Sequence, residues 1–191
     1  SIKGKLLAGA KKVTSARVNA AGKLSDLVSA EISGLSMPHT RFYSDVISPD
    51  YEGALKESDF TITGCDEILM SIQAHKDRPK VALGKGASGG EMSRIMLALE
   101  VVIAASAPVG TYIFDEVDAG VGGKAAVEVG RRLAKLSKSS QVIVVTHLPQ
   151  VAAWADRHFV VAKDSDGQIV QSGVSQLDEK ARVTEIARML A

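Results

Sequence analysis

The feature that most constrains the fold is a pair of short apolar runs, each followed by polar residues that can take part in chemistry. Residues 112–114 lead directly into Asp115 and Glu116, and residues 142–146 lead into His147. Helix-like segments flank both runs, and strands that alternate with helices are typical of a parallel sheet covered on both faces. Ligands bind such sheets beyond the carboxyl ends of the strands. The sequence therefore predicts an α/β fold with Asp115, Glu116 and His147 at its binding edge.

The other elements follow from apolar periodicity and from glycine and proline breaks. We expect a long basic helix and then a small β-rich part, followed by alternating helices and strands to the end of the chain. The expected helices cover 1–35, 89–105, 125–136, 148–156 and 179–190, and the further strands cover 41–47, 60–63, 68–74, 158–162 and 168–174, with a loop over 75–85 and a hairpin turn at 166–167.

Basic residues dominate the first helix before its first acid, Asp26. A charge run of this kind is typical of a solvated helix face. The alternatives are a surface for DNA phosphates or the base of a coiled coil, although the heptad pattern is too short to establish a coiled coil by itself. The basic residues are Lys3, Lys5, Lys11, Lys12, Arg17 and Lys23.

Composition excludes several classes of protein. The chain of 191 residues is 46% hydrophobic, which suits a buried core and argues against disorder. Its net charge of +1 limits DNA contact to a local patch, and 4% aromatic residues do not favour base stacking. No apolar run reaches the roughly 20 residues that span a bilayer, and the single Cys65 excludes an internal disulfide. We expect a cytoplasmic protein with no membrane partner, and we interpret the missing initiating Met as the mark of an excised piece.

The acid pair after the first apolar run suits nucleotide chemistry. Asp115 can lie near Mg²⁺, usually through a water molecule. Glu116 can polarise an attacking water if its geometry and pKa allow. Adjacent acids after a buried strand also occur as ordinary loop residues, so this motif does not decide the function alone.

A glycine-containing segment opens the expected helix at 89. Ser88 suits the N-cap position and Glu91 follows at the spacing of a capping box, so a well-capped helix explains both residues. Gly89 and Gly90 add bare backbone N–H groups at the positive end of the helix, and such groups bind phosphate oxygens. His147, which at a strand end is often structural, can hold a γ-phosphate by hydrogen bonding if it lies beside the acid pair.

Two glycine motifs are weaker matches. Residues 84–89 fit G-x-G-x-x-G, but a dinucleotide site requires a full strand before the motif and a single acid about 20 residues after it. Residues 120–125 resemble a phosphate-binding loop, but Ala125 stands where that loop needs Ser or Thr. Neither a zinc-ligand spacing nor a G-x-S-x-G motif occurs.

Taken in order, these motifs resemble the C-terminal motor half of ABC ATPases. Residues 87–91 are similar to the signature loop, residues 114–116 to the end of Walker B, and His147 to the switch histidine. Over 60–190, the segments LGKGASGGEMSRIMLALE, FDEVDAGVGGKAA and QVIVVTHLPQVAAWADRHFVV resemble the RecN family of bacterial SMC-like DNA repair proteins, and TGCDEILM resembles the β-lobe of its actinobacterial members. Many SMC heads have Asp in place of Gly122, whereas this chain has Asp118 four residues earlier. The usual aspartate role at that position is therefore not transferred.

The resemblance implies a C-terminal lobe of an ABC/SMC-type ATPase head over 36–191, with helix 1–35 as the base of its coiled-coil arm. It implies ATP and Mg²⁺ as cofactors, and the N-terminal half of the head, with its Walker A loop, as a partner. A second head would complete an ATP-dependent homodimer that acts on DNA ends or junctions between single and double strands at the nucleoid. By this analogy the loop Ser88, Gly89, Gly90 and Glu91 contacts ATP in trans, Asp115 serves Mg²⁺, Glu116 positions water and His147 holds the γ-phosphate.

Three alternatives remain open at this stage. The basic first helix favours a non-enzymatic DNA-binding or architectural module. The motifs also fit the head half of another SMC or ABC family. The match at 84–89 leaves a dinucleotide-dependent enzyme as the last alternative.

Overall fold

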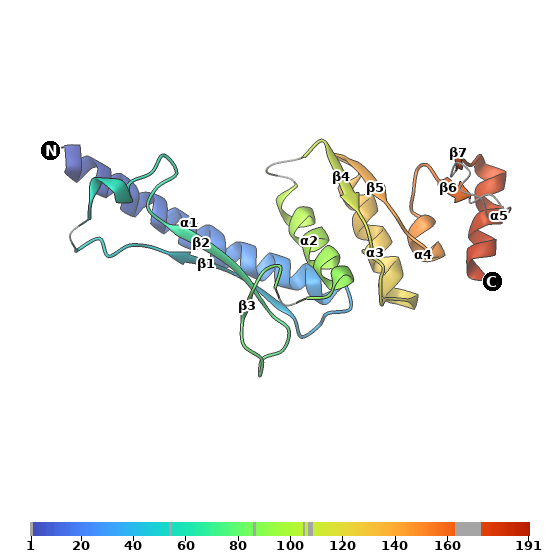
Figure 1. Cartoon of the computed structure of the whole chain (residues 1–191), viewed down its shortest axis with the longest axis horizontal. Helices are drawn as coiled ribbons and strands as arrows, with labels where there is room; N and C mark the ends of the chain where they lie inside the picture. The colour runs from blue at the N-terminus through green and yellow to red at the C-terminus, as the bar shows by residue number, and fades with distance from the viewer. Residues whose placement is uncertain (1, 54, 86, 105, 107–108, 163–172) are drawn as a thin grey trace, which may run out of the picture. The chain divides into compact units, whose positions relative to one another are not determined.

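The computed structural model describes residues 2–53, 55–85, 87–104, 106, 109–162 and 173–191. It divides into two compact units, Ser1–Ser88 and Gly89–Ala191, and Figure 1 shows the elements of each. No helix among the described residues has both the length and the apolar character that crossing a membrane requires.

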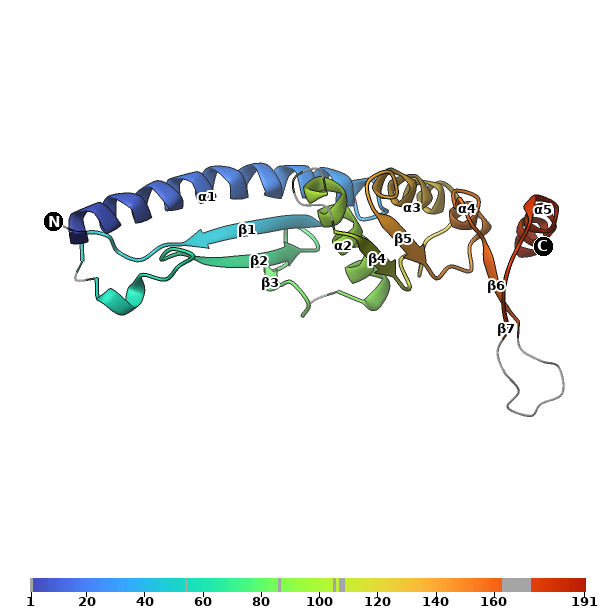
Figure 2. The ribbon, with the colours of Figure 1, turned by 90° about the horizontal axis from the view of Figure 1, so that it is seen from above.

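The first unit is a long helix packed on a small antiparallel sheet. Helix α1 (Ile2–Ser33) lies along the strands, as Figure 2 shows. The sheet order is β1-β2-β3, and a 3₁₀ turn precedes β2. The bounds are Arg41–Ile47 for β1, Glu67–Gln73 for β2, Val81–Ala82 for β3 and Glu57–Asp59 for the 3₁₀ turn η1.

Helix α1 covers the outer edge of β1. The Ser29 hydroxyl accepts a hydrogen bond from the Phe42 amide at 3.0 Å, and the Ser25 hydroxyl accepts one from the Ser44 amide at 2.9 Å. These bonds satisfy backbone donors that an edge strand otherwise leaves open. Phe42 pairs with Ile72 across the sheet, and both are almost completely buried. The predicted helix and the strands over 41–47 and 68–74 are therefore confirmed.

The predicted strand over 60–63 is wrong, because this segment forms a tight turn. The backbones of Thr61 and Gly64 bond to each other, and Gly64 has a φ of 100°. The Thr61 hydroxyl donates to the Gly64 carbonyl at 2.6 Å and accepts from the Thr63 amide at 3.2 Å. Such local bonds of threonine hydroxyls compete with strand pairing. The predicted loop over 75–85 also contains the short strand β3.

A buried ion pair fixes this turn to α1. The Arg17 guanidinium lies 2.9 Å from a carboxylate oxygen of Asp66, whose side chain is 0% exposed. The other Asp66 oxygen accepts from the Thr14 hydroxyl, and Arg17 also donates to the Thr63 carbonyl. The pair therefore joins the helix to the turn that precedes β2.

Asp66→Ala is expected to lower the free energy of unfolding by about 2 kcal/mol, because it leaves a largely buried guanidinium without its carboxylate. Urea unfolding followed by circular dichroism measures the change. The control is Glu52→Ala, which removes an exposed ion pair with Lys11 and should cost less than about 0.5 kcal/mol. Equal losses in the two variants would contradict the prediction.

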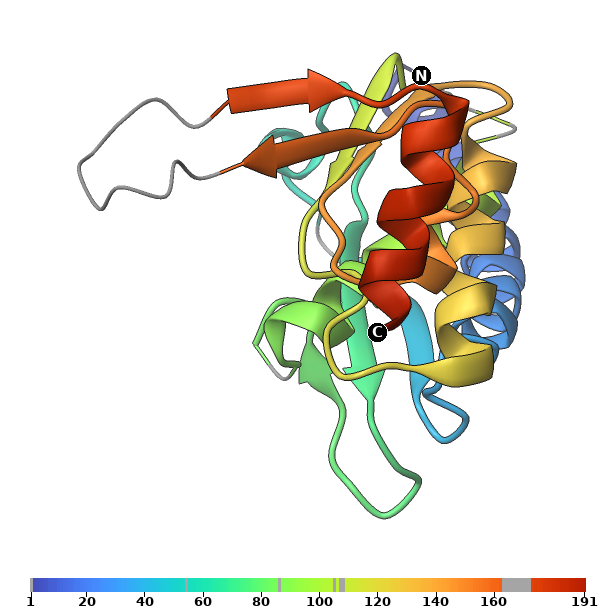
Figure 3. The same ribbon diagram turned by 90° about the vertical axis from the view of Figure 1, so that its right-hand side faces the viewer.

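The second unit alternates helices and strands, and Figure 3 shows its antiparallel pair β6–β7. Strands β4 and β5 form a separate parallel pair in which Phe114 lies opposite Val144. The bounds are Gly89–Ile103 (α2), Thr111–Phe114 (β4), Gly123–Leu136 (α3), Gln141–Val144 (β5), Pro149–Ala152 (α4), Phe159–Ala162 (β6), Gly173–Gln176 (β7) and Glu179–Leu190 (α5).

The predicted parallel sheet is confirmed. We predicted that both of its faces would be covered, but only one face is buried. Tyr112 and Phe114 are buried, whereas Ile113, Ile143 and Val145 are 72%, 45% and 60% exposed. Parallel sheets are normally buried on both faces. The uncovered face therefore marks a surface on which further protein is expected to pack.

The predicted helix over 148–156 is too long. Helix α4 ends at Ala152, and the amides of Trp154 and Ala155 then bond three residues back. Trp154 lies against Gly130 of α3, where an added Cβ would come within 2.3 Å of the indole. The predicted turn at 166–167 and residues 168–172 of the predicted strand lie outside the described residues.

Candidate functional site

The carboxyl ends of β4 and β5 lie side by side, and the predicted site residues follow them. The Val145 amide donates to the Phe114 carbonyl at 3.0 Å, which continues the parallel pairing to the strand ends. Asp115 and Glu116 come next after β4, and His147 follows two residues after Val145. All three predicted residues are exposed, and the topology thus places them at the edge of the sheet where α/β proteins bind ligands.

Asp118 connects the two strand ends, and the sequence did not indicate this role. Its side chain is 2% exposed and accepts hydrogen bonds from the Thr146 hydroxyl and from the His147 amide, the latter at 3.2 Å. A carboxylate oxygen of Asp118 also lies 3.6 Å from the Nδ1 atom of His147. The Thr146 hydroxyl in turn accepts from the Leu148 amide at 3.0 Å. Asp118 therefore holds the backbone of His147 in relation to the acid pair, and its carboxylate lies near the ring.

The acid pair lies in a tight turn. Glu116 has a φ of 56°, a left-handed conformation that is uncommon for residues other than glycine. Its amide donates to Asp115 Oδ1 at 2.9 Å, and its carbonyl accepts from the Ala119 amide at 3.0 Å. These bonds maintain a conformation that costs energy, and such conformations concentrate at functional sites.

The start of α2 packs tightly on this turn. An added Cβ on Gly90 would lie 3.0 Å from the Ala119 carbonyl oxygen and 3.1 Å from that of Glu116. On Gly89 it would lie 2.7 Å from Glu116 Oε2. The sequence explained both glycines by phosphate binding, and the structure adds a packing reason, since Gly90 is buried against its own chain.

Two side chains of α2 strengthen this contact. The Ser93 hydroxyl donates to the Asp115 carbonyl at 2.8 Å, and the Arg94 guanidinium donates to the Ala119 carbonyl at 2.6 Å. Arg94 is only 5% exposed. Burial lowers the pKa of Arg94, and the nearby carboxylate of Glu91 opposes that shift. The helix start and the acid turn consequently form one packed substructure.

The electrostatics at the start of α2 favour an anion. Backbone N–H groups at a helix N-terminus attract negative charge, and Glu116 Oε2 would lie 2.7 Å from a Cβ added at Gly89. Ser88 and Glu91 flank this point and are exposed. A phosphate near the helix start would therefore be attracted by the backbone N–H groups and repelled by the Glu116 carboxylate.

Asp115 is suited to serve Mg²⁺ only together with other ligands. The described residues contain no group of three or more His, Cys, Asp or Glu side chains that could hold a metal ion. Asp115 is exposed and uses Oδ1 to accept the Glu116 amide. Mg²⁺ is commonly bound by one or two carboxylates together with water and substrate phosphates, so a single exposed carboxylate fits an ion that arrives with a nucleotide.

Known proteins similar in sequence are DNA repair proteins. The chain is 50% identical over 186 residues to the DNA repair protein RecN of Streptomyces coelicolor, and the match covers 95% of this chain and 32% of that protein. It is 46% identical over 190 residues to RecN of Mycobacterium leprae, a match that covers 92% of this chain and 32% of that protein. It is 36% identical over 189 residues to RecN of Bacillus subtilis, a match that covers 95% of this chain and 33% of that protein. The chain thus spans about a third of the length of these curated relatives. No family model matches it.

Solved structures similar to the chain are SMC heads. The SMC head domain with coiled coil and joint from Pyrococcus yayanosii matches with a TM-score of 0.62 at 22% identity, over 92% of this chain and 30% of that one. A chain from work on ATP-driven dimerization and DNA-stimulated activation of SMC ATPases matches with a TM-score of 0.54 at 21% identity, over 93% and 98%. At these identities the likeness concerns the fold. The chain is therefore a homologue of the RecN DNA repair proteins, with the α/β fold of an SMC ATPase head lobe.

Proposed function

We propose that the chain is the C-terminal half of the ATPase head of a RecN-type DNA double-strand break repair protein. It supplies the signature loop, Walker B and the switch histidine to an ATP-driven head dimer that acts in recombinational repair in the cytoplasm, at the nucleoid. The observation that carries the proposal is the junction at the strand ends, where Asp118 ties His147 to the acid turn.

Each of the site residues would have a different role in ATP hydrolysis. Mg²⁺, when bound, would offset phosphate charge, and Asp115 is the carboxylate that would hold it. Glu116 would accept a hydrogen bond from the attacking water and orient it. His147 would donate a hydrogen bond to the γ-phosphate, and Asp118 would hold its ring in position. The loop Ser88 to Glu91 would contact the nucleotide of a second head, through the bare amides at the start of α2.

The exposed sheet face supports a partner that completes the head. A phosphate-binding loop requires G-x-x-x-x-G-K followed by Ser or Thr, and this sequence contains none. The N-terminal half of the same head would supply that loop. Ile113, Ile143 and Val145 would become buried beneath it, and the parallel pair would then have cover on both faces.

Reconstitution tests this proposal. The chain alone is expected to hydrolyse essentially no ATP, and addition of a separately expressed N-terminal half should produce phosphate release. Ile113→Glu should prevent reconstitution because it places a charge on the uncovered face, while folding is spared since Ile113 is 72% exposed. Val183→Glu on α5, at a position 70% exposed, is the matched control and should reconstitute normally. Hydrolysis by the chain alone at the rate of the mixture would refute the proposal.

A DNA-binding role without catalysis is the second candidate, and the solvent face of α1 favours it. Lys5, Lys12 and Lys23 are exposed and lie on one side of the helix, since spacings of 7 and 11 residues return to nearly the same angle. Lys11 and Arg17 point elsewhere and form ion pairs with Glu52 and Asp66. DNA, at ends or at junctions of single and double strands, is the partner that we propose for either candidate.

A further inference from the structure

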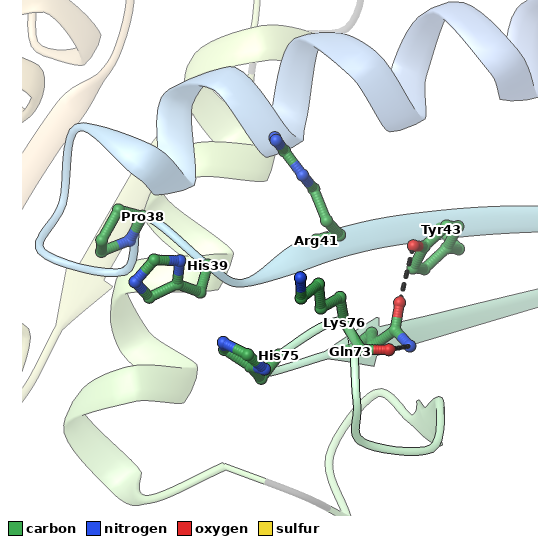
Figure 4. A pocket seen from close by; sticks show the side chains of 7 residues that line it. All are labelled: Pro38, His39, Arg41, Tyr43, Gln73, His75 and Lys76. Carbon is green, nitrogen blue, oxygen red and sulfur yellow. Dashed lines mark hydrogen bonds between the residues drawn. The ribbon is translucent and has the colours of Figure 1, made fainter.

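The first unit contains a hollow of about 540 Å³ beside the sheet, shown in Figure 4. His39 precedes β1, Arg41 begins it, and His75 and Lys76 follow β2. Arg41 lies opposite Gln73 in the strand register, so two neighbouring strands and their adjoining loops place these side chains around one space.

The hollow carries positive charge that the described residues do not neutralise. The described residues that line it include no acid, and neither Arg41 nor Lys76 forms an ion pair within the part of the chain that the structure describes. Asp77 on the adjoining loop lies 3.2 Å from His75 Nδ1. By contrast, Lys80, directly before β3, pairs with Asp45. A concave surface with one sign of charge concentrates counter-ions.

Hydrogen bonds hold the frame of this hollow. The Tyr43 hydroxyl donates to Gln73 Oε1 at 2.8 Å, as Figure 4 shows. Gln73 Nε2 donates to the Arg78 carbonyl at 2.7 Å and to the Lys76 carbonyl at 3.3 Å, which fixes the loop after β2. The rings of His39 and His75 meet edge to face, with centroids 5.3 Å apart. The basic groups are therefore presented from a fixed backbone.

The lining suits phosphate rather than a base. The Tyr43 ring has the Lys80 ammonium 3.7 Å from its centroid, and its hydroxyl is already bonded to Gln73. One face of that ring is thus already covered by a cation and is not open to a base. An arginine fork and a lysine ammonium are the groups that bind phosphate oxygens, and most protein–DNA hydrogen bonds go to the sugar-phosphate backbone.

We propose that this hollow binds phosphates of a DNA backbone, with Arg41 and Lys76 as the principal contacts and His39 and His75 as further donors. The inference rests on the proposed function in its choice of DNA as the partner. It assigns DNA contact to a place separate from the lysine face of α1, which the sequence alone had favoured. A free phosphate has the same chemistry, and the experiment separates the two sources.

Binding of the full chain to a labelled duplex with a single-stranded end is measured by fluorescence anisotropy over a range of salt. Arg41→Gln/Lys76→Gln should weaken binding about 10-fold at low salt and reduce the slope of log K against log[salt] by about 1–2, as expected when two phosphate contacts are lost. Lys135→Gln/Lys138→Gln removes the same charge from exposed positions of the second unit and should change affinity by less than about 3-fold. Equal losses in both variants, or no DNA binding by the unmodified chain, would overturn the proposal.

Histidine NMR signals provide a readout that does not depend on affinity. Of the four histidines, His39 and His75 should shift on addition of the duplex, while His147 and His158 in the second unit serve as internal references. Shifts with inorganic phosphate but none with the duplex would show a small-anion site and overturn the DNA assignment. DNA-independent ATP hydrolysis in the reconstituted head tests the proposed function separately, because Arg41 and Lys76 take no part in it.

Discussion

Glu116→Gln should reduce ATP turnover by the reconstituted head about 10²–10⁴-fold, the usual scale for loss of a general base. The amide keeps the size of the side chain but accepts a proton poorly. The main-chain turn that Glu116 forms should survive, because its bonds to Asp115 and Ala119 use backbone atoms of Glu116. Nucleotide binding should therefore persist while hydrolysis fails, as measured by fluorescent nucleotide titration beside single-turnover phosphate release.

Two further variants sharpen this result. Glu179→Gln removes an exposed carboxylate from the first turn of α5 and should leave turnover unchanged. Gly89→Ala places a methyl group 2.7 Å from the present position of Glu116 Oε2 and displaces the carboxylate without deleting it, so a loss of about 10-fold is expected. Turnover at the unmodified rate in Glu116→Gln would remove the acid from the mechanism.

Asp118→Ala should affect stability and catalysis together. The change leaves the Thr146 hydroxyl and the His147 amide without their buried acceptor, which is expected to lower the free energy of unfolding by about 2–4 kcal/mol. Turnover should fall about 10–100-fold, because His147 loses the carboxylate that bonds to its backbone amide and lies near its ring. Urea unfolding and phosphate release measure the two effects.

Asp118→Asn separates the effect of Asp118 on stability from its effect on turnover. The amide oxygen can still accept the bonds from Thr146 and His147, so most of the stability should return, whereas the charge facing the imidazole is lost. If Asp118 acts through His147, the losses of turnover in Asp118→Asn and His147→Ala should not add in the double variant. Fully additive losses would assign Asp118 a structural role only.

The sequence predicted the elements whose patterns are local. The strand over Arg41–Ile47 and the helix over Glu179–Leu190 were placed to the residue, because apolar spacing marks both elements and Asp178 caps the start of the helix. The strand over 60–63 failed since hydroxyl bonds and the ion pair between Arg17 and Asp66 decide that segment. Contacts of this kind cannot be read from the spacing of apolar residues along the sequence.

The candidate site shows the same division. A general rule about parallel sheets was sufficient to bring Asp115, Glu116 and His147 to one edge. The burial of Asp118 and the packing of Gly90 required coordinates, because each depends on residues from a different element. The available signal for Asp118 was a third acid only two residues after Glu116, between Val117 and Ala119. The roles of these residues toward ATP stay predictions.

The absence of a side chain at Gly90 has a consequence for the coupling between the two nucleotide sites of the proposed dimer. A Cβ added at Gly90 would lie only 3.0–3.1 Å from the two facing carbonyl oxygens, so the helix start and the acid turn pack closely together. In the proposed dimer, α2 would touch the nucleotide of one head and Glu116 would act on the nucleotide of the other. A shift of α2 at the first nucleotide would then displace Glu116. Nucleotide bound at the start of α2 would thereby affect the rate at which the other nucleotide is hydrolysed.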